Sequence, residues 1–291
     1  MHLRSACSFA AIFACFAAAG CPQSAKQDDK KPTPIPLVKV ENQSEIKPGE
    51  KETPSAEAAK WGAVVGRIVW EGAIPADAPI DVSMNGDCKK HSPIRNETWS
   101  IHAKNKGLQS CFVWLAPKDA KDKKAKLPIH PDFKGAPNEP AVVDQPGCAF
   151  VPHALGMRGG QKLVVKNPAE FAHNFKYTGN PELPLQSGNP LLVGKSQKEI
   201  VGLVADRLPI VIECSIHPWM RGYIRVFDHP YFAVTDADGK FEIKNAPTGE
   251  CRLMIWHGAG GSAGGAKGRE GKAIEVKENS DLGDLTYPAP K

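Results

Sequence analysis

Hydrophobic and polar residues alternate in short stretches along most of the chain, and glycine or proline separates one stretch from the next. A period of two, bounded by turn-forming residues, is typical of β-strands that bury one face. Few segments repeat apolar residues at the 3.6-residue period of a helix. We therefore predict an all-β protein, with its clearest strands at 63–72, 108–117, 162–167, 209–214, 223–227 and 245–256, and a hairpin at 231–244 that turns at Asp238-Gly239.

The first twenty residues lack this alternation and have the order of a targeting signal. A short polar start with Arg4 precedes an apolar run that ends in Ala18-Ala19-Gly20-Cys21. This order resembles the bacterial lipoprotein signal, which implies a signal peptide at 1–20 and lipidation at Cys21. Cleavage without lipidation is the alternative. The apolar run is too short to span a bilayer, and no later segment is long and apolar enough to do so.

Residues 21–60 are rich in lysine, acidic residues, serine and proline, and contain too few apolar residues to build a core. We predict a disordered tether there. Signal and tether together imply a periplasmic protein of the cell envelope, held to a membrane by its lipid anchor. Pro22 stands where an aspartate is often associated with inner-membrane retention, which slightly favours the outer membrane. The net charge of +5 is too small for a nucleic-acid partner.

The stretch Glu213 to Gly222 combines a thiol, an imidazole and a thioether without a carboxylate between them. Cys214, His217 and Met220 are the donors, and a set of one Cys, two His and a weak axial Met is the blue-copper arrangement. The second histidine has to come from elsewhere, and His173, just after the strand 162–167, is the best candidate. The alternative interpretation is a buried free thiol beside an ordinary loop histidine.

These residues resemble the cupredoxins, and most of all the amicyanin group. The shared pattern is Cys, two residues, His-Pro, an aromatic residue, Met-Arg-Gly, with a distant His-Asn pair after a strand that ends in Asn. The resemblance implies a Greek-key β-sandwich that holds one type 1 copper ion. The implied copper ligands are His173, Cys214, His217 and Met220.

The same resemblance assigns roles to residues around the ion. The backbone N–H of Asn174 would donate to the Cys214 sulfur, and its side chain would tie the two ligand loops together. His217, with Pro218 and Trp219, would be the exposed edge through which electrons pass to a redox partner protein. The chain departs from the amicyanin pattern at Lys176, where that group has a histidine that is not a ligand.

The segments that flank this region resemble a second family. The pattern Asp-x-Asp-Gly-x-Phe-x-Ile from Asp236, followed by Pro-x-Gly-x-x-x-Leu, is similar to the carboxypeptidase regulatory-like domains, which are small transthyretin-like sandwiches. We predict a discontinuous sandwich from 61–127 and 231–291, with the cupredoxin domain, 128–230, inserted. Three consecutive units are the alternative. The whole arrangement resembles exported bacterial proteins called methylamine-utilisation-like, a label that implies no substrate.

The chain has eight cysteines, of which Cys7 and Cys15 leave with the signal peptide. Lipidation takes Cys21 and copper takes Cys214, so four remain, and three pairings are possible in an oxidising compartment. Within the resemblance to the regulatory-like domains, we predict the disulfides Cys111–Cys251 and Cys88–Cys148. A second metal site from Cys88, His91, Cys148 and His153 is the disfavoured alternative.

The leading hypothesis for function is one-electron transfer by a lipid-anchored blue copper protein. The alternatives are an envelope copper carrier and a structural lipoprotein without a redox role. We predict no enzymatic activity and no small-molecule substrate. A Gly-x-Ser-x-Gly match around Ser262 lacks the following helix and the later histidine that a hydrolase needs.

Overall fold

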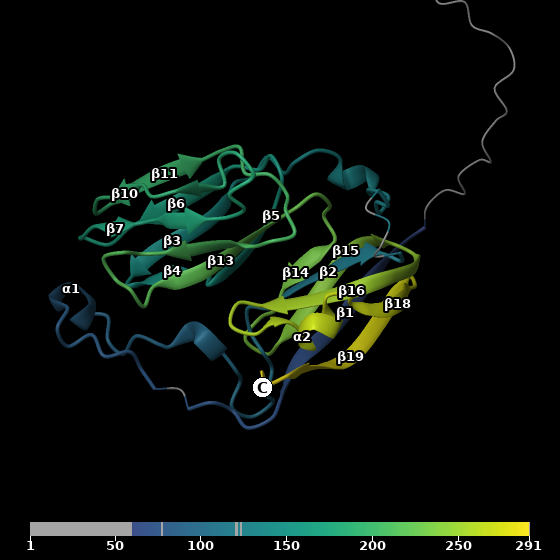
Figure 1. The fold of residues 1–291 in the computed structure, drawn as a ribbon, viewed down its shortest axis with the longest axis horizontal. Coiled ribbons are helices and arrows are strands. Elements are labelled where there is room, and N and C mark those ends of the chain that lie inside the picture. Colours follow the sequence, from purple (N-terminus) through teal and green to yellow (C-terminus); the bar gives the residue numbers. More distant parts are fainter. Residues whose placement is uncertain (1–59, 77, 120–121, 123, 291) are drawn as a thin grey trace, which may run out of the picture. The chain divides into compact units, whose positions relative to one another are not determined.

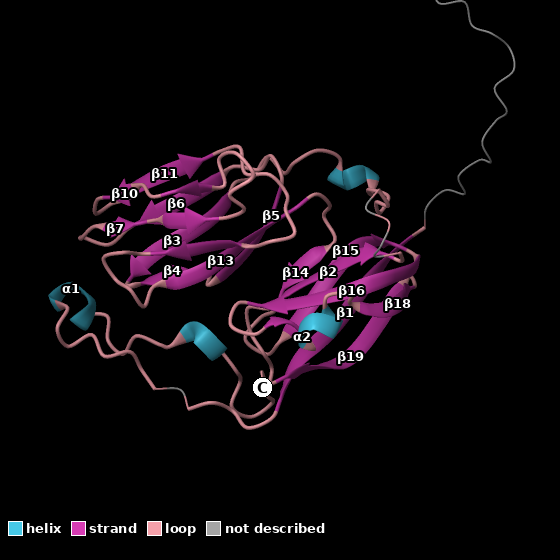
Figure 2. Ribbon diagram, in the orientation of Figure 1, coloured by secondary structure: helices cyan, strands magenta, loops and turns pink. Residues whose placement is uncertain are grey.

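The computed structural model describes residues 60–76, 78–119, 122 and 124–290, and this part of the chain is all-β (Figure 2). The predicted signal peptide 1–20, the lipidation site Cys21 and the tether as far as residue 59 lie outside the described residues. Everything described belongs to one compact unit, Ser55–Lys291. No helix among these residues is long and apolar enough to cross a membrane. The helical segments described are single turns: α1 (Gly86–Lys89), α2 (Gly265–Gly268), and 3-10 turns at Glu97–Trp99 and Pro131–Phe133.

Two sheets are built from strands near the start and the end of the described chain (Figure 1). One has the order β15-β1-β19, and the other has the order β14-β2-β16-β17, with β18 also paired to β16. β1 pairs antiparallel with β15 and parallel with β19. The strands are β1 (Trp61–Glu71), β2 (Phe112–Pro117), β14 (Phe232–Val234), β15 (Lys240–Pro247), β16 (Gly249–His257), β17 (Gly261–Ser262), β18 (Lys272–Val276) and β19 (Asn279–Pro288).

Two further sheets, of four and five strands, and one short pair come from the middle of the chain. Their orders are β11-β6-β3-β4, β5-β13-β12-β8-β9 and β10-β7. The strands are β3 (Ala141–Gly147), β4 (Ala149–Val151), β5 (Ala154–Arg158), β6 (Leu163–Asn167), β7 (His173–Asn174), β8 (Lys176–Thr178), β9 (Ser187–Gly188), β10 (Leu191–Leu192), β11 (Ser196–Ile200), β12 (Ile210–Glu213) and β13 (Arg221–Phe227). No described strand from the start or the end of the chain pairs with a strand from the middle. The domain boundaries at 127 and 230 remain a prediction.

Alternating side chains of these middle strands fill one apolar core. Val143 and Val165 come from β3 and β6, and Ile212 and Ile224 come from the facing sheet, all with an exposed fraction of 0%. Burial of such side chains contributes about 1.5–3 kcal/mol each to the free energy of unfolding. Cys214 and Met220 belong to the same buried cluster, so the candidate ligands lie at the edge of a packed core.

The predicted hairpin at 231–244 is wrong, because its two strands join different sheets. β14 pairs with β2, whereas β15 pairs with β1. Thr235 extends the β14 pairing, since its backbone N–H donates to Cys111 O and its carbonyl accepts the N–H of Ser110. The turn itself forms, with Gly239 at a φ of 77°, so the Asp-Gly pair here links two sheets.

Residues 80–94, which we call the strap, pack on the core of the middle strands. Ile80 and Ile94 form an isolated backbone bridge that brings the two ends of the strap together. Val82 and Ile94 are buried in the same cluster as Cys214. The disulfide Cys88–Cys148 joins the strap to the turn between β3 and β4, which is the pairing expected from the sequence.

The predicted disulfide Cys111–Cys251 is wrong, since both residues are buried free thiols. The register of β2 against β16 gives the reason. Phe112 lies opposite Trp256, so Cys111 is next to the far end of β16, whereas Cys251 lies opposite Pro117. Six residues along a strand separate the two positions by roughly 20 Å, far beyond the reach of a disulfide.

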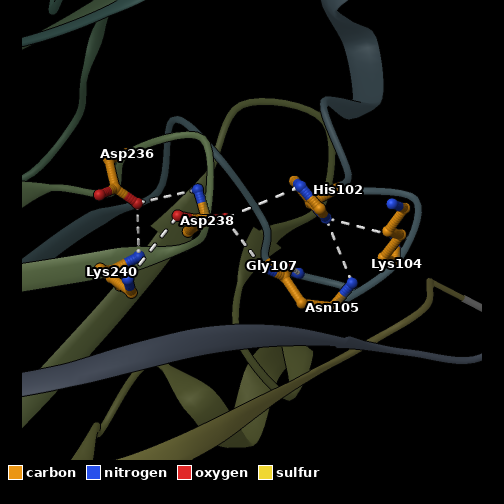
Figure 3. Close-up of polar contacts among 7 residues, drawn as sticks. All are labelled: His102, Lys104, Asn105, Gly107, Asp236, Asp238 and Lys240. Carbon is orange, nitrogen blue, oxygen red and sulfur yellow. Dashed lines mark hydrogen bonds and ion pairs between the residues drawn. The ribbon is translucent and has the colours of Figure 1, made fainter.

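A polar network fixes the loop after the strap to the turn between β14 and β15 (Figure 3). The Asn105 side-chain amide donates to Asp238 Oδ1 over 2.8 Å, and its oxygen accepts the N–H of Gly107 at the same distance. His102 Nε2 lies 3.8 Å from that Asp238 oxygen. Asp236 accepts the backbone N–H of Asp238, so hydrogen bonding within the turn explains these aspartates without a metal ion.

Replacement of Gly107 by alanine should destabilise the protein, because a Cβ there would overlap the Asp238 carbonyl group. We expect Gly107→Ala to lower the free energy of unfolding by about 2 kcal/mol or more in chemical denaturation. Gly86→Ala is the matched control, since nothing lies within 4 Å of a Cβ at that position. Equal midpoints for the two variants would contradict this close approach.

Candidate metal centre

The loop Cys214–Met220 connects β12 to β13, which pair as an antiparallel hairpin. Burial alternates along β12, so Cys214 continues the buried face on which Ile212 lies. Two backbone hydrogen bonds close the loop: Cys214 N–H donates to Met220 O over 3.2 Å, and Met220 N–H donates to His217 O over 2.9 Å. The loop therefore presents its sulfur and imidazole groups inward from a fixed backbone.

His173 lies on the short strand β7, opposite Leu192 on β10. Asn167, the last residue of β6, holds this segment in place although it is fully buried. Its amide donates to the carbonyl groups of Phe171, Leu192 and Val193 over 2.9, 3.0 and 3.1 Å. Because β6 ends in this side chain, the loop that follows is directed back toward the β12–β13 hairpin.

The structure brings His173, Cys214 and His217 together as a triangle of donor atoms. The Cys214 sulfur lies 3.9 Å from His173 Nδ1 and 3.7 Å from His217 Nδ1, and the two Nδ1 atoms are 3.0 Å apart. The exposed fractions of the three residues are 0%, 2% and 2%. Two histidines and one cysteine thus lie together in one buried site, although the segments that contribute them are about 40 residues apart in sequence.

These separations fit a single metal ion. Donors that share an ion at about 2.0–2.3 Å and tetrahedral angles lie roughly 3.3–3.6 Å from one another, close to the measured triangle. The donor chemistry is soft, since it consists of a thiol and two imidazoles without a carboxylate. Met220 is 2% exposed and belongs to the same buried cluster as Cys214.

Asn174 connects the two ligand segments directly. Its side-chain oxygen accepts the backbone N–H of Ser215 over 2.7 Å and that of Ile216 over 3.3 Å, and it lies 3.4 Å from the Cys214 sulfur. Its amide donates to Asn189 Oδ1 over 2.5 Å. The predicted tie between the loops is therefore present, and it is made by the side chain of Asn174.

Burial keeps both imidazoles neutral. It is the main cause that lowers the pKa of His173 to about 4, with repulsion from His217 and His91 adding to it. Burial also lowers the pKa of His217, while the nearby Asp87 carboxylate acts in the opposite direction on both groups. A neutral imidazole has a free nitrogen lone pair, which metal coordination requires.

The predicted exposed edge at His217 is wrong, because this residue is 2% exposed. The strap is the cause: the sulfurs of Cys88 and Cys148 both lie within 4.8 Å of a His217 ring nitrogen. Trp219 is partly buried, and its indole N–H donates to Cys148 O over 3.2 Å. Of the predicted edge, only Pro218 is exposed.

Two contributors to the site have roles that the sequence did not indicate. Asn167 enters the sequence pattern only as the residue that ends the strand before the His-Asn pair, whereas in the structure its hydrogen bonds shape the loop of His173. The strap covers His217, but no local pattern in residues 80–94 indicates where they pack. The disfavoured second site loses its thiols to the Cys88–Cys148 disulfide, and His153 instead lies 3.5 Å from Glu97.

Comparison with models of protein families finds no match, and comparison with curated proteins finds none either. Among solved structures, a purple cupredoxin from Nitrosopumilus maritimus is 21% identical, covering 30% of this chain and 99% of its own, with a TM-score of 0.25. An oxidised amicyanin mutant is 21% identical, covering 30% and 82%, with a TM-score of 0.27. A copper-containing nitrite reductase from Thermus scotoductus is 21% identical, covering 35% and 28%, with a TM-score of 0.29.

Removal of the Asn174 side chain should loosen the ligand loop. Asn174→Ala leaves the N–H groups of Ser215 and Ile216 without their acceptor, so we expect a loss of about 1–3 kcal/mol in chemical denaturation. The Cys214 thiol of the metal-free variant should also react faster with a thiol reagent. Asn189→Ala is the control, because it removes a partner of Asn174 and leaves the loop N–H groups bonded. Unchanged thiol reactivity in Asn174→Ala would contradict this role.

Stability of the metal-free protein should fall as the pH drops from about 6.5 to about 4. The pKa of His173 is about 4 in the folded chain against an ordinary value of 6.5, so the unfolded chain binds more protons between these values. The stabilisation is complete above pH 6.5 and is lost toward pH 4. His173→Gln should make this dependence shallower in denaturation curves measured across that range. His229 and His257 have pKa values lowered to about 4 by burial, so some slope should remain. Identical slopes would argue against a neutral, buried His173.

Proposed function

We propose that this protein is a blue copper protein that transfers single electrons in the cell envelope. One type 1 copper ion would be held by His173, Cys214 and His217, with Met220 as the weak fourth ligand. The observation that carries the proposal is the buried triangle of one sulfur and two Nδ1 atoms, with edges of 3.0–3.9 Å. The resemblance of both ligand loops to the cupredoxin pattern supports it.

Copper, when bound, supplies a one-electron couple that a thiolate and two imidazoles tune. The chain's own contribution is to hold these donors in fixed positions and to shield them from solvent. Asn174 locks the loop of Cys214 to the strand of His173, and Asn167 locks the preceding turn. Because the donors are already gathered within a packed core, a change of charge at the site moves few atoms.

Electrons would leave through the residues that connect His217 to the surface. The Trp219 ring lies 5.5 Å from the His217 ring, and it is only partly buried. Pro218, next to it, is exposed. A redox partner protein of the envelope would contact this small patch, as suits the brief encounters of electron transfer. No nucleic acid and no small-molecule substrate is part of the proposal.

Membrane attachment belongs to the same proposal and rests on the sequence alone. Lipid on Cys21 would anchor the chain, and the tether 21–60 would allow the folded part to reach a partner. A periplasmic location, on the outer membrane in preference to the inner, follows from the residues after the signal.

A copper carrier is the second candidate, and one observation favours it. The strap and its disulfide cover His217, which blocks the most direct contact between the centre and a redox partner. A carrier has no need of such contact, whereas an electron shuttle does. Reversible voltammetry of the copper-loaded protein separates the two, because a carrier without a redox role has no need for fast electron exchange at an electrode.

Copper loading should produce strong absorption at about 600 nm, as expected for a cysteine thiolate bound to Cu(II) in a type 1 site. Cys214→Ser should abolish this band, and His173→Gln should weaken or shift it, in visible spectra of protein reconstituted with one equivalent of copper. Cys111→Ser is the matched control, because this thiol is also buried and free but belongs to the other core. Bound copper without the band would contradict a blue site, and equal loss in the control would contradict the assignment to Cys214.

A further inference from the structure

A second set of soft donor atoms lies beside the first. The sulfurs of Cys88 and Cys148 and one ring nitrogen of His217 all lie within 4.8 Å of one another. The exposed fractions of the three residues are 0%, 0% and 2%. In the structure the two sulfurs are joined as a disulfide, and a disulfide does not ligate metal as thiolates do.

Reduction of this disulfide would turn the set into two thiolates and one imidazole. Such a donor set suits a soft ion, and it contains no carboxylate that would favour a harder one. Zinc accepts the same three ligands only with a water or another ligand in the fourth position. The three residues here have exposed fractions of 0–2%, so a three-donor site closed to solvent favours Cu(I).

We propose that, in the dithiol form of the protein, Cys88, Cys148 and His217 bind one Cu(I) ion. A dithiol reductant transfers two electrons and two protons, so that the Cys88–Cys148 bond breaks, two thiols form and the reductant becomes a disulfide. Binding of Cu(I) then releases the two thiol protons, and the oxidation state of the copper does not change. This inference adds two donors that the proposed function leaves aside, Cys88 and Cys148, and it shares His217 with the proposed copper site.

The position of the strap allows this change without rebuilding a sheet. Cys88 lies in the single turn α1, where its N–H donates to Asn85 Oδ1 over 3.0 Å, and Cys148 lies in the turn between β3 and β4. The Ile80–Ile94 bridge and the buried side chain of Ile94 hold the strap independently of the disulfide. The two sulfurs can thus separate to the distance that a shared ion requires.

His217 belongs to both donor sets, so an ion bound at the second site already contacts a ligand of the first. Its Nδ1 faces Cys214 and His173, and a ring nitrogen lies near the sulfurs of Cys88 and Cys148. The shared histidine makes the second site a loading position, from which Cu(I) reaches the inner donors. Exchange with an oxidising disulfide then takes two electrons and two protons from the Cys88 and Cys148 thiols, so that the Cys88–Cys148 bond forms over His217 and the oxidant becomes a dithiol. The centre would then be covered by the same bond whose absence admitted the ion.

Copper titration of a Cys214→Ser chain tests this proposal, because the inner site is then disabled. The full chain is reduced with excess dithiol, which is removed under argon, and Cu(I) is offered in competition with bicinchoninate. The reduced protein should withdraw about one Cu(I) per chain from the chelator, and the oxidised protein should withdraw none. Equal withdrawal by the two forms would overturn the proposal.

Variants identify the donors. Adding Cys88→Ser to Cys214→Ser should abolish the withdrawal by the reduced protein, whereas adding Cys111→Ser or Cys251→Ser, at the other buried free thiols, should not. Adding His217→Gln should weaken Cu(I) binding roughly tenfold or more. Binding that survives Cys88→Ser, or that disappears with Cys251→Ser, would overturn the assignment. X-ray absorption of the reduced, copper-loaded Cys214→Ser chain should show two sulfur ligands and one nitrogen ligand. This measurement does not depend on whether a further variant folds.

The result is separable from that of the proposed function. Absorption at about 600 nm tests the disulfide form of the wild-type chain, whereas the titration tests the dithiol form without Cys214. A wild-type chain that lacks the blue band, together with Cu(I) binding by reduced Cys214→Ser, would leave this inference standing and the electron-transfer proposal refuted.

Discussion

One amide oxygen joins the two halves of the candidate metal centre. Asn174 Oδ1 accepts the N–H groups of Ser215 and Ile216, although about 40 residues separate it from them. These bonds fix the loop of Cys214 against the strand of His173, and so they set the spacing of the three donors. Without them the partly buried N–H groups of the loop would lose their acceptor, and the loop would lose its attachment to the strand of His173.

Burial then gives this geometry its chemical character. Both imidazoles are shielded from water, so their pKa values fall and the neutral forms prevail beside the Cys214 sulfur. The strap adds to this effect by covering His217, which in an open loop would meet solvent. The same packing that prepares the donors for a metal ion therefore limits how a partner can approach them, and the exposed Pro218 marks where approach is possible.

Prediction from sequence succeeded for those features that residues close together in the sequence determine. The alternation at 162–167 and 209–214 corresponds to β6 and β12, and the residue types in the loop after β12 indicated a soft-metal site. The strand predicted at 108–117 begins later, at Phe112, because Ser110 has a φ of 64° that no strand accepts. Local propensity does not report such a single backbone conformation when the residue is not glycine.

The remaining errors concern pairs of segments. The Asp-Gly turn forms between β14 and β15, yet the strands on its two sides join different sheets, and the register of β2 with β16 separates Cys111 from Cys251. Residue types alone sufficed for most of the strands and for the donor set, because each follows from local periodicity or from the chemistry of a few side chains. The Cys88–Cys148 bond was predicted only as the remainder of the Cys111–Cys251 pairing, which the structure does not form. Contacts between distant residues decide the rest: the strand partners, the hydrogen bonds of Asn174 to the ligand loop, and the burial of His217. These contacts contribute to stability only when the whole chain has packed.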